Sequence, residues 1–91
     1  MSTAQTPVTN ELPSVLMDVT AERQRQITKG WTTKHDDWHS THELVTLAEK
    51  RLHSPGRPAA ESGYYDRQRL IEGIAMLVAA VEAWDRRGAD A

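Results

Sequence analysis

Apolar residues recur at helical spacing along much of the chain, most densely between Leu70 and Trp84. Counted from Leu70, large apolar side chains follow at offsets of 1, 4, 7, 8, 11 and 14, which is one face of an α-helix. The opposite face carries glycine, alanine and one methionine. A helix that is apolar nearly all round is buried on more than one side. In so short a chain, we expect the second side to meet another copy of the protein.

Two shorter patterns precede this helix. A first helix is predicted from Asn10, a capping residue, to Gly30, a common stop signal. A second helix begins at Ser40, where a glutamate three positions on completes a capping box. Between them, residues 31–39 break the helical period and are predicted to form an ordered loop pinned by its two tryptophans. Residues 53–63, with two prolines and two glycines, predict a second loop.

These elements predict an all-α fold with three helices. The third helix starts at Tyr64 or Asp66 and runs to Arg87, where Gly88 stops it. We expect the second and third helices to form an antiparallel hairpin with the first packed across it. This single domain spans residues 10–88, preceded by a flexible arm at 1–9 and followed by a tail at 89–91. It is expected to form a homodimer or higher oligomer.

Composition narrows the range of functions. The chain has 91 residues, no cysteine and a formal net charge of -2. Disulfides and thiolate metal sites are therefore excluded, and no basic face suggests direct nucleic-acid binding. The longest uncharged apolar run, residues 73–81, is far shorter than the ~18 residues of a membrane span. We therefore expect a cytoplasmic protein with no membrane partner.

Three charged residues interrupt the apolar faces of the predicted helices: Arg23 in the first, and Arg67 and Asp85 in the third. In one interpretation they line a polar pocket, where Arg23 or Arg67 holds a phosphate-like anion and Trp31 stacks on a base. In the other, Arg23 forms a buried ion pair with Asp85 or with an aspartate of the 31–39 loop. Trp31 and Trp38 are then hydrophobic plugs.

Carboxylates suggest a metal site at two places. Asp36 and Asp37 lie in the sequence HDDWH, and Glu82 and Asp85 form an E-x-x-D pair on one side of a helix. Hard oxygen ligands of this kind suit Mg²⁺, and no other cofactor is expected. The alternative is structural: the two loop aspartates lie at the capped start of the second helix, where its dipole favours anions, and the E-x-x-D pair forms salt bridges with Arg86.

Several of these residues stand together in short motifs. They are Glu22-Arg23-x-Arg25-Gln26, Gly30-Trp31, His35-Asp36-Asp37-x-His39 and Glu43-Leu44, followed in the third helix by Leu70, Ala75, Leu77, Ala80, Glu82 and Asp85-Arg86. Together they resemble a family of small phage and prophage proteins. That family is distantly similar to the all-α, MazG-like nucleotide pyrophosphohydrolases.

The resemblance implies a phage accessory protein and leaves three hypotheses. The one we favour is a non-enzymatic antagonist of host defence that captures a nucleotide-like anion with Arg23, Trp31 and Arg67. The second is a reduced MazG-like hydrolase that uses Glu82, Asp85 and the loop containing His35, Asp36 and Asp37 to hold Mg²⁺. Such hydrolases need a second carboxylate pair on a facing helix, and the chain lacks one. The third is an anti-CRISPR-like inhibitor that binds a host defence protein through its surface.

Overall fold

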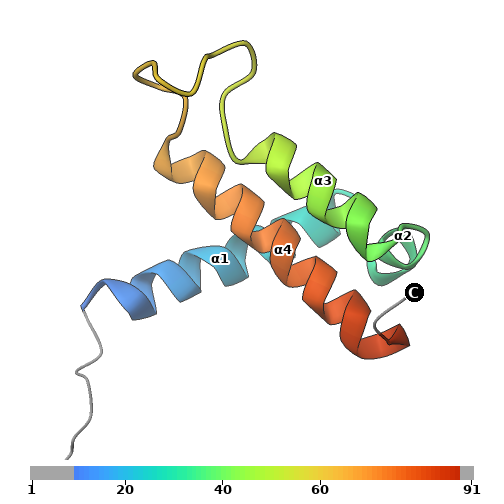
Figure 1. Ribbon diagram of the computed structural model, residues 1–91. Coiled ribbons are helices and arrows are strands. Elements are labelled where there is room, and N and C mark those ends of the chain that lie inside the picture. Colours follow the sequence, from blue (N-terminus) through green and yellow to red (C-terminus); the bar gives the residue numbers. More distant parts are fainter. Residues whose placement is uncertain (1–9, 89–91) are drawn as a thin grey trace, which may run out of the picture.

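The computed structural model describes residues 10–88, and that part of the chain is all-helical, without strands. These residues form four helices, which are labelled in Figure 1. The predicted all-α class is confirmed, although the described part of the chain forms one helix more than expected. The predicted arm at 1–9 and tail at 89–91 lie outside the described residues. The helices are α1 Glu11–Thr28, α2 Thr33–Asp37, α3 Thr41–Arg51 and α4 Arg67–Arg87.

Most helix ends follow from local signals. The capping box at the start of α3 is confirmed: the backbone N–H of Ser40 donates to Glu43 Oε1 at 2.8 Å, and the N–H of Glu43 donates to Ser40 Oγ at 3.1 Å. Asp66 caps α4 by accepting from the N–H of Arg69 at 2.9 Å. Gly88 ends α4 at a positive φ of 91°. Asn10 occupies the N-cap position of α1 but makes no side-chain capping bond.

All other helices pack against α4. In Figure 1, α1 crosses α4, whereas α3 runs beside it in the opposite direction. The face of α4 that meets α3 consists of small residues. A Cβ added at Gly73 would lie 2.3 Å from Cδ2 of Leu52, so this glycine is needed for the close approach of the two helices. Farther along, Ala80 and Ala83 pack on Leu44 of α3.

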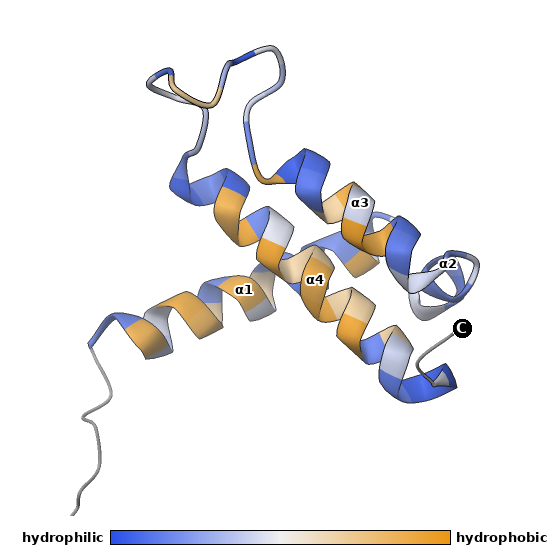
Figure 2. Ribbon diagram, viewed as in Figure 1, coloured by the Kyte–Doolittle hydropathy of each residue, from blue (hydrophilic) through white to orange (hydrophobic). Residues whose placement is uncertain are grey.

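Five large apolar residues of α4 point the other way, and here the expectation from the sequence was wrong. The stripe expected to form the core is exposed along most of its length. Figure 2 shows that apolar residues, in orange, recur along α4. The core side consists of the small face together with Ile71 and Ala75, which pack on Val19 of α1. The exposed stripe, which we call the α4 seam, consists of Leu70, Ile74, Leu77, Val81 and Trp84.

The segment from residue 31 to residue 39 was predicted as a loop, and the structure places helix α2 within it. The side chain of Thr32 caps this short helix by accepting from the N–H of His35. The two tryptophans beside it differ. Trp31 is half-buried and contacts His35 at a ring-centroid distance of 4.7 Å, whereas Trp38 is 80% exposed. Trp38 is therefore not the hydrophobic plug that the plug hypothesis assigned to both indoles.

The loop between α3 and α4 is closed at its base. The N–H of Ser54 donates to the carbonyl of Tyr64 at 2.8 Å, and the rings of His53 and Tyr64 stack at a centroid distance of 4.5 Å. These contacts bring the end of α3 close to the start of α4. None of the helices within residues 10–88 is long and apolar enough to cross a membrane.

Candidate functional site

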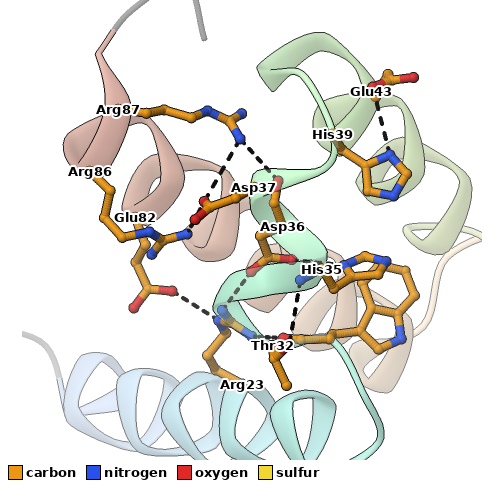
Figure 3. A network of polar contacts seen from close by, with 11 residues as sticks. Arg23, Thr32, His35, Asp36, Asp37, His39, Glu43, Glu82, Arg86 and Arg87 are labelled. Atoms are coloured by element: carbon orange, nitrogen blue, oxygen red, sulfur yellow. Dashed lines mark hydrogen bonds and ion pairs between the residues drawn. The ribbon is translucent and has the colours of Figure 1, made fainter.

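Arg23 is the centre of a network of polar contacts (Figure 3). Its Nε donates to Glu82 Oε1 of α4 at 2.9 Å, and one terminal nitrogen donates to Asp36 Oδ2 of α2 at 2.9 Å. The other terminal nitrogen donates to the carbonyl oxygen of Trp31 at 3.1 Å. All three nitrogens of the buried guanidinium therefore have protein partners. This is the ion pair with a loop aspartate that the structural interpretation anticipated.

Asp36 is the innermost carboxylate of this network, with a side chain that is fully buried. Its second oxygen, Oδ1, lies 3.1 Å from Nδ1 of His35, and its backbone carbonyl accepts from Arg87 at 3.0 Å. Because a buried carboxylate without a partner is very costly, these contacts fix α2 between α1 and α4.

Asp37 makes the second link between α2 and α4. Its Oδ1 accepts from Arg86 at 2.9 Å, and a nitrogen of Arg87 lies 3.9 Å from the same oxygen. The expectation that Asp36 and Asp37 are fixed by the start of α3 was therefore wrong. Their turn is helical, which directs both carboxylates to arginines of α1 and α4, and the capping box of Ser40 and Glu43 caps α3 without them.

The candidate ligand-binding residues are only partly brought together. Arg23 and Trp31 are in contact, but Arg67 pairs with Asp18 at 2.7 Å on the exposed surface. Arg67 lies about 22 Å along α4 from Glu82, the residue that Arg23 contacts, at ~1.5 Å of rise per residue.

The candidate metal ligands do not converge. Asp36 and Glu82 both contact Arg23, Asp37 contacts Arg86, and Asp85 lies exposed beside the α4 seam. Within residues 10–88 no three histidine or carboxylate side chains form a group that could hold a metal ion. Asp36, Asp37 and Glu82 are therefore ion-paired structural groups, and Asp85 makes no ion pair with another residue from 10 to 88.

A cleft of about 460 Å³ lies between α1, the end of α3 and the start of α4. Three cationic side chains reach it: Arg25 from α1, Lys29 directly after the end of α1, and Arg51 from α3. Trp31 forms part of its wall, and Glu72 is the only carboxylate among its lining residues. We call this space the basic cleft. Its remaining lining residues are Gln26, Gln68 and Met76.

Hydrogen bonds hold the floor of the basic cleft in place. Arg25 donates from two nitrogens to the carboxylate of Glu22, and Gln26 Nε2 donates to the same carboxylate at 3.0 Å and to the carbonyl of Glu72 at 3.2 Å. The bonds from Arg25 hold the pKa of Glu22 below its ordinary value of 4.5, against the opposing effect of burial. Glu22 is thus ionised at neutral pH and orients Arg25.

Reasoning from the sequence missed the basic cleft, although one signal was present. Arg25 and Lys29 are four positions apart and therefore share a face of one helix. Arg51 gave no such signal, because its approach to them depends on how α3 and α1 pack on α4. Searches against protein-family models, curated proteins and solved structures return no match to the chain.

Proposed function

We propose that the protein is a non-enzymatic helical binding protein that captures a small nucleotide-like anion in the basic cleft. The observation that carries the proposal is the convergence of three cationic side chains beside an indole. This is the function favoured from the sequence, with the site moved from Arg23 and Arg67 to Arg25, Lys29 and Arg51. The resemblance to phage proteins suggests a role against host defence in the host cytoplasm.

The charges of the cleft favour an anion. Arg25 is oriented by Glu22, and Arg51 lies 3.4 Å from Glu72, a distance that leaves this pair loose. Lys29 makes no ion pair with any residue from 10 to 88, so it supplies a positive charge that is not paired with a carboxylate of these residues. A phosphate between these groups would receive paired donors from the guanidinium groups and a point charge from the lysine.

The indole and the size of the cleft favour a ligand with a base. Trp31 is half-buried, so its ring is held in place while part of it stays open to the cleft. Stacking of a base on an aromatic ring contributes roughly 1–3 kcal/mol. The cleft volume of about 460 Å³ falls within the range of small-molecule sites, roughly 300–1,000 Å³.

The reduced hydrolase receives less support from the same geometry. Metal-dependent pyrophosphate cleavage of the MazG type needs carboxylates that converge on a cation, and the carboxylates nearest the cleft are paired with arginines instead. Glu22 accepts from Arg25, and Glu72 faces Arg51. The arrangement therefore suits holding a phosphate rather than cleaving it.

An inhibitor that binds a host protein is the second candidate function. The observation that favours it is Trp38, which is 80% exposed beside Lys34 and Asp37 on the outer side of α2. Exposed tryptophans of this kind are common anchors in protein interfaces. Loss of binding to a host protein in a Trp38→Ala variant, with nucleotide binding unchanged, would favour this candidate.

Isothermal titration calorimetry with ATP and with inorganic pyrophosphate tests the proposed ligand class. We expect saturable binding of ATP, weaker binding of pyrophosphate, and a ~tenfold or greater loss in Lys29→Glu, which corresponds to about 1.4 kcal/mol. Lys34→Glu is the matched control, because this lysine is exposed on α2 outside the basic cleft. Equal affinity in the two variants, or no binding by the wild type, would contradict the proposal.

A further inference from the structure

The α4 seam is a regular row of exposed apolar side chains on the longest helix of the described residues. Its five side chains are between 36% and 59% exposed. They follow one another at steps of 4, 3, 4 and 3 positions, which is the spacing of a coiled-coil seam. Neither α1 nor α3 covers them, because α1 packs on the side of Ala75 and α3 on the side of Gly73 and Ala80.

We propose that two copies of the chain pair through the α4 seam, with their α4 helices antiparallel, as a homodimer. The spacing of the seam residues is nearly the same when it is read in either direction along the helix, so two antiparallel seams can face each other. With a two-fold axis at Leu77, Leu70 of one copy lies opposite Trp84 of the second, and Ile74 lies near Val81. Large side chains then face each other over about 21 Å of helix, at ~1.5 Å per residue.

The charges beside the seam select the antiparallel direction and identify a second copy as the occupant. Arg67 and Asp85 are 18 positions apart, which is five full turns, so they lie on the same edge at opposite ends of the seam. A two-fold axis keeps this edge on one side of the dimer. Arg67 of each copy therefore lies beside Asp85 of the other, whereas a parallel pair would place the charged edges of the two copies on opposite sides of the interface and leave these residues without a partner across it.

Both charged groups are available for this contact. Asp85 is exposed and makes no ion pair with another residue from 10 to 88. Arg67 already donates to Asp18, but the pair is exposed and a guanidinium has five N–H donors, so Arg67 can serve two carboxylates.

The seam also has room for a partner's side chains. A groove of about 560 Å³ separates it from Thr41 and Val45 of α3. An interface of ordinary stability buries roughly 800 Å² on each partner, more than five half-exposed side chains provide. The walls of this groove and the two flanking charged groups add to the contact area.

Sedimentation velocity over a range of concentrations tests the dimer. We expect the wild type to dimerise and Leu77→Glu to remain monomeric with an unchanged helical circular-dichroism spectrum. Asp85→Arg alone should weaken the dimer ~tenfold, because it places two like charges at each end. The double variant Arg67→Asp/Asp85→Arg should recover most of the lost dimer affinity, because it restores opposite charges at each end. A wild type that is monomeric at every concentration would overturn the proposal.

Cysteine cross-linking tests the direction, and the chain has no cysteine of its own to interfere. Leu70→Cys and Trp84→Cys proteins should each cross-link poorly alone and form a disulfide-linked heterodimer when mixed and oxidised. Cross-linking of Leu70→Cys with itself would indicate a parallel pair and overturn the antiparallel arrangement. Gln24→Cys, on the exposed side of α1, is the control for random collision.

Discussion

Arg23 joins three separate parts of the chain through one guanidinium group. It contacts Glu82 on α4, Asp36 on α2 and the carbonyl of Trp31. The sequence predicted a partner for it, because a charge on the apolar face of a helix needs one. The identity of this partner depends on the short helix α2, which turns Asp36 inward and which the sequence did not predict. The sequence offered only the alternatives of Asp85 or a loop aspartate.

Replacing Arg23 by alanine should destabilise the fold strongly. Asp36 would remain fully buried without a cation, and loss of one partner of a buried ion pair costs roughly 3–5 kcal/mol. Urea unfolding followed by circular dichroism measures this loss. The control is Arg57→Ala, which removes an exposed pair with Glu61 and should cost no more than about 1 kcal/mol. Equal losses in the two variants would contradict the structural role of Arg23.

Stability should fall in acid because Glu22 and Glu43 have lowered pKa values. Bonds from Arg25 lower the pKa of Glu22, and the backbone N–H of Ser40 lowers that of Glu43, each from an ordinary value of 4.5. A lowered folded-state pKa gives stability that is present above pH 4.5 and lost as the pH falls through the folded value.

Urea unfolding at neutral pH and in acid measures this pH dependence. Glu22→Gln and Glu43→Gln should each show a smaller loss between the two conditions than the wild type, because neither variant can release or take up that proton. Glu49→Gln, an exposed change on α3, should behave like the wild type. If both variants lose as much stability in acid as the wild type does, other groups control the acid response.

At the scale of the helices, α4 is organised by the size of its side chains rather than by their hydrophobicity alone. The sequence identified both apolar faces correctly but assigned the core to the wrong one. Periodicity distinguishes apolar from polar faces, and α4 has two apolar faces. Small residues let α3 approach closely, as at Gly73, and this contact leaves the larger residues outside.

Gly73→Ala tests that close approach, because it should destabilise the wild type and stabilise a variant that lacks the Leu52 side chain. In the wild type, the added Cβ would lie 2.3 Å from Leu52 Cδ2, so we expect a loss of about 1–2 kcal/mol. In a Leu52→Ala background the obstruction is gone, and alanine should stabilise the helix by up to about 1 kcal/mol over glycine. Thermal melts of the wild type, the two single variants and the double variant measure the effect of Gly73→Ala on stability in each background. A loss of stability in both backgrounds, or a gain in both, would contradict the close packing at Gly73.

Adjacent positions of α4 should respond oppositely to the same charge. Ala80 is 4% exposed against Leu44, whereas Val81 is 59% exposed on the α4 seam. Ala80→Glu should therefore unfold the protein or cost more than about 4 kcal/mol, because it buries a charge without a partner. Val81→Glu should leave the circular-dichroism spectrum and melting midpoint of the monomer nearly unchanged. An intact, stable Ala80→Glu protein would contradict the packing of α3 on α4.

At the scale of the whole molecule, the basic cleft and the α4 seam lie on different faces of α4. Gln68, Glu72 and Met76 line the cleft, whereas Leu70 and Leu77 belong to the seam. We therefore expect ligand binding and dimerisation to be independent. Calorimetry should find the same ATP affinity for Leu77→Glu as for the wild type. If Leu77→Glu loses both dimerisation and ATP binding, the ligand site needs the second copy.

Fluorescence of a protein with Trp31 as its single indole tests the central claim most directly. Trp38→Phe and Trp84→Phe change two exposed residues outside the basic cleft, so any signal then reports on Trp31. We predict that ATP changes this emission in a saturable manner, that pyrophosphate changes it less, and that Lys29→Glu shifts the ATP curve to ~tenfold higher concentration. Emission that stays constant throughout the ATP titration would contradict nucleotide capture at this cleft.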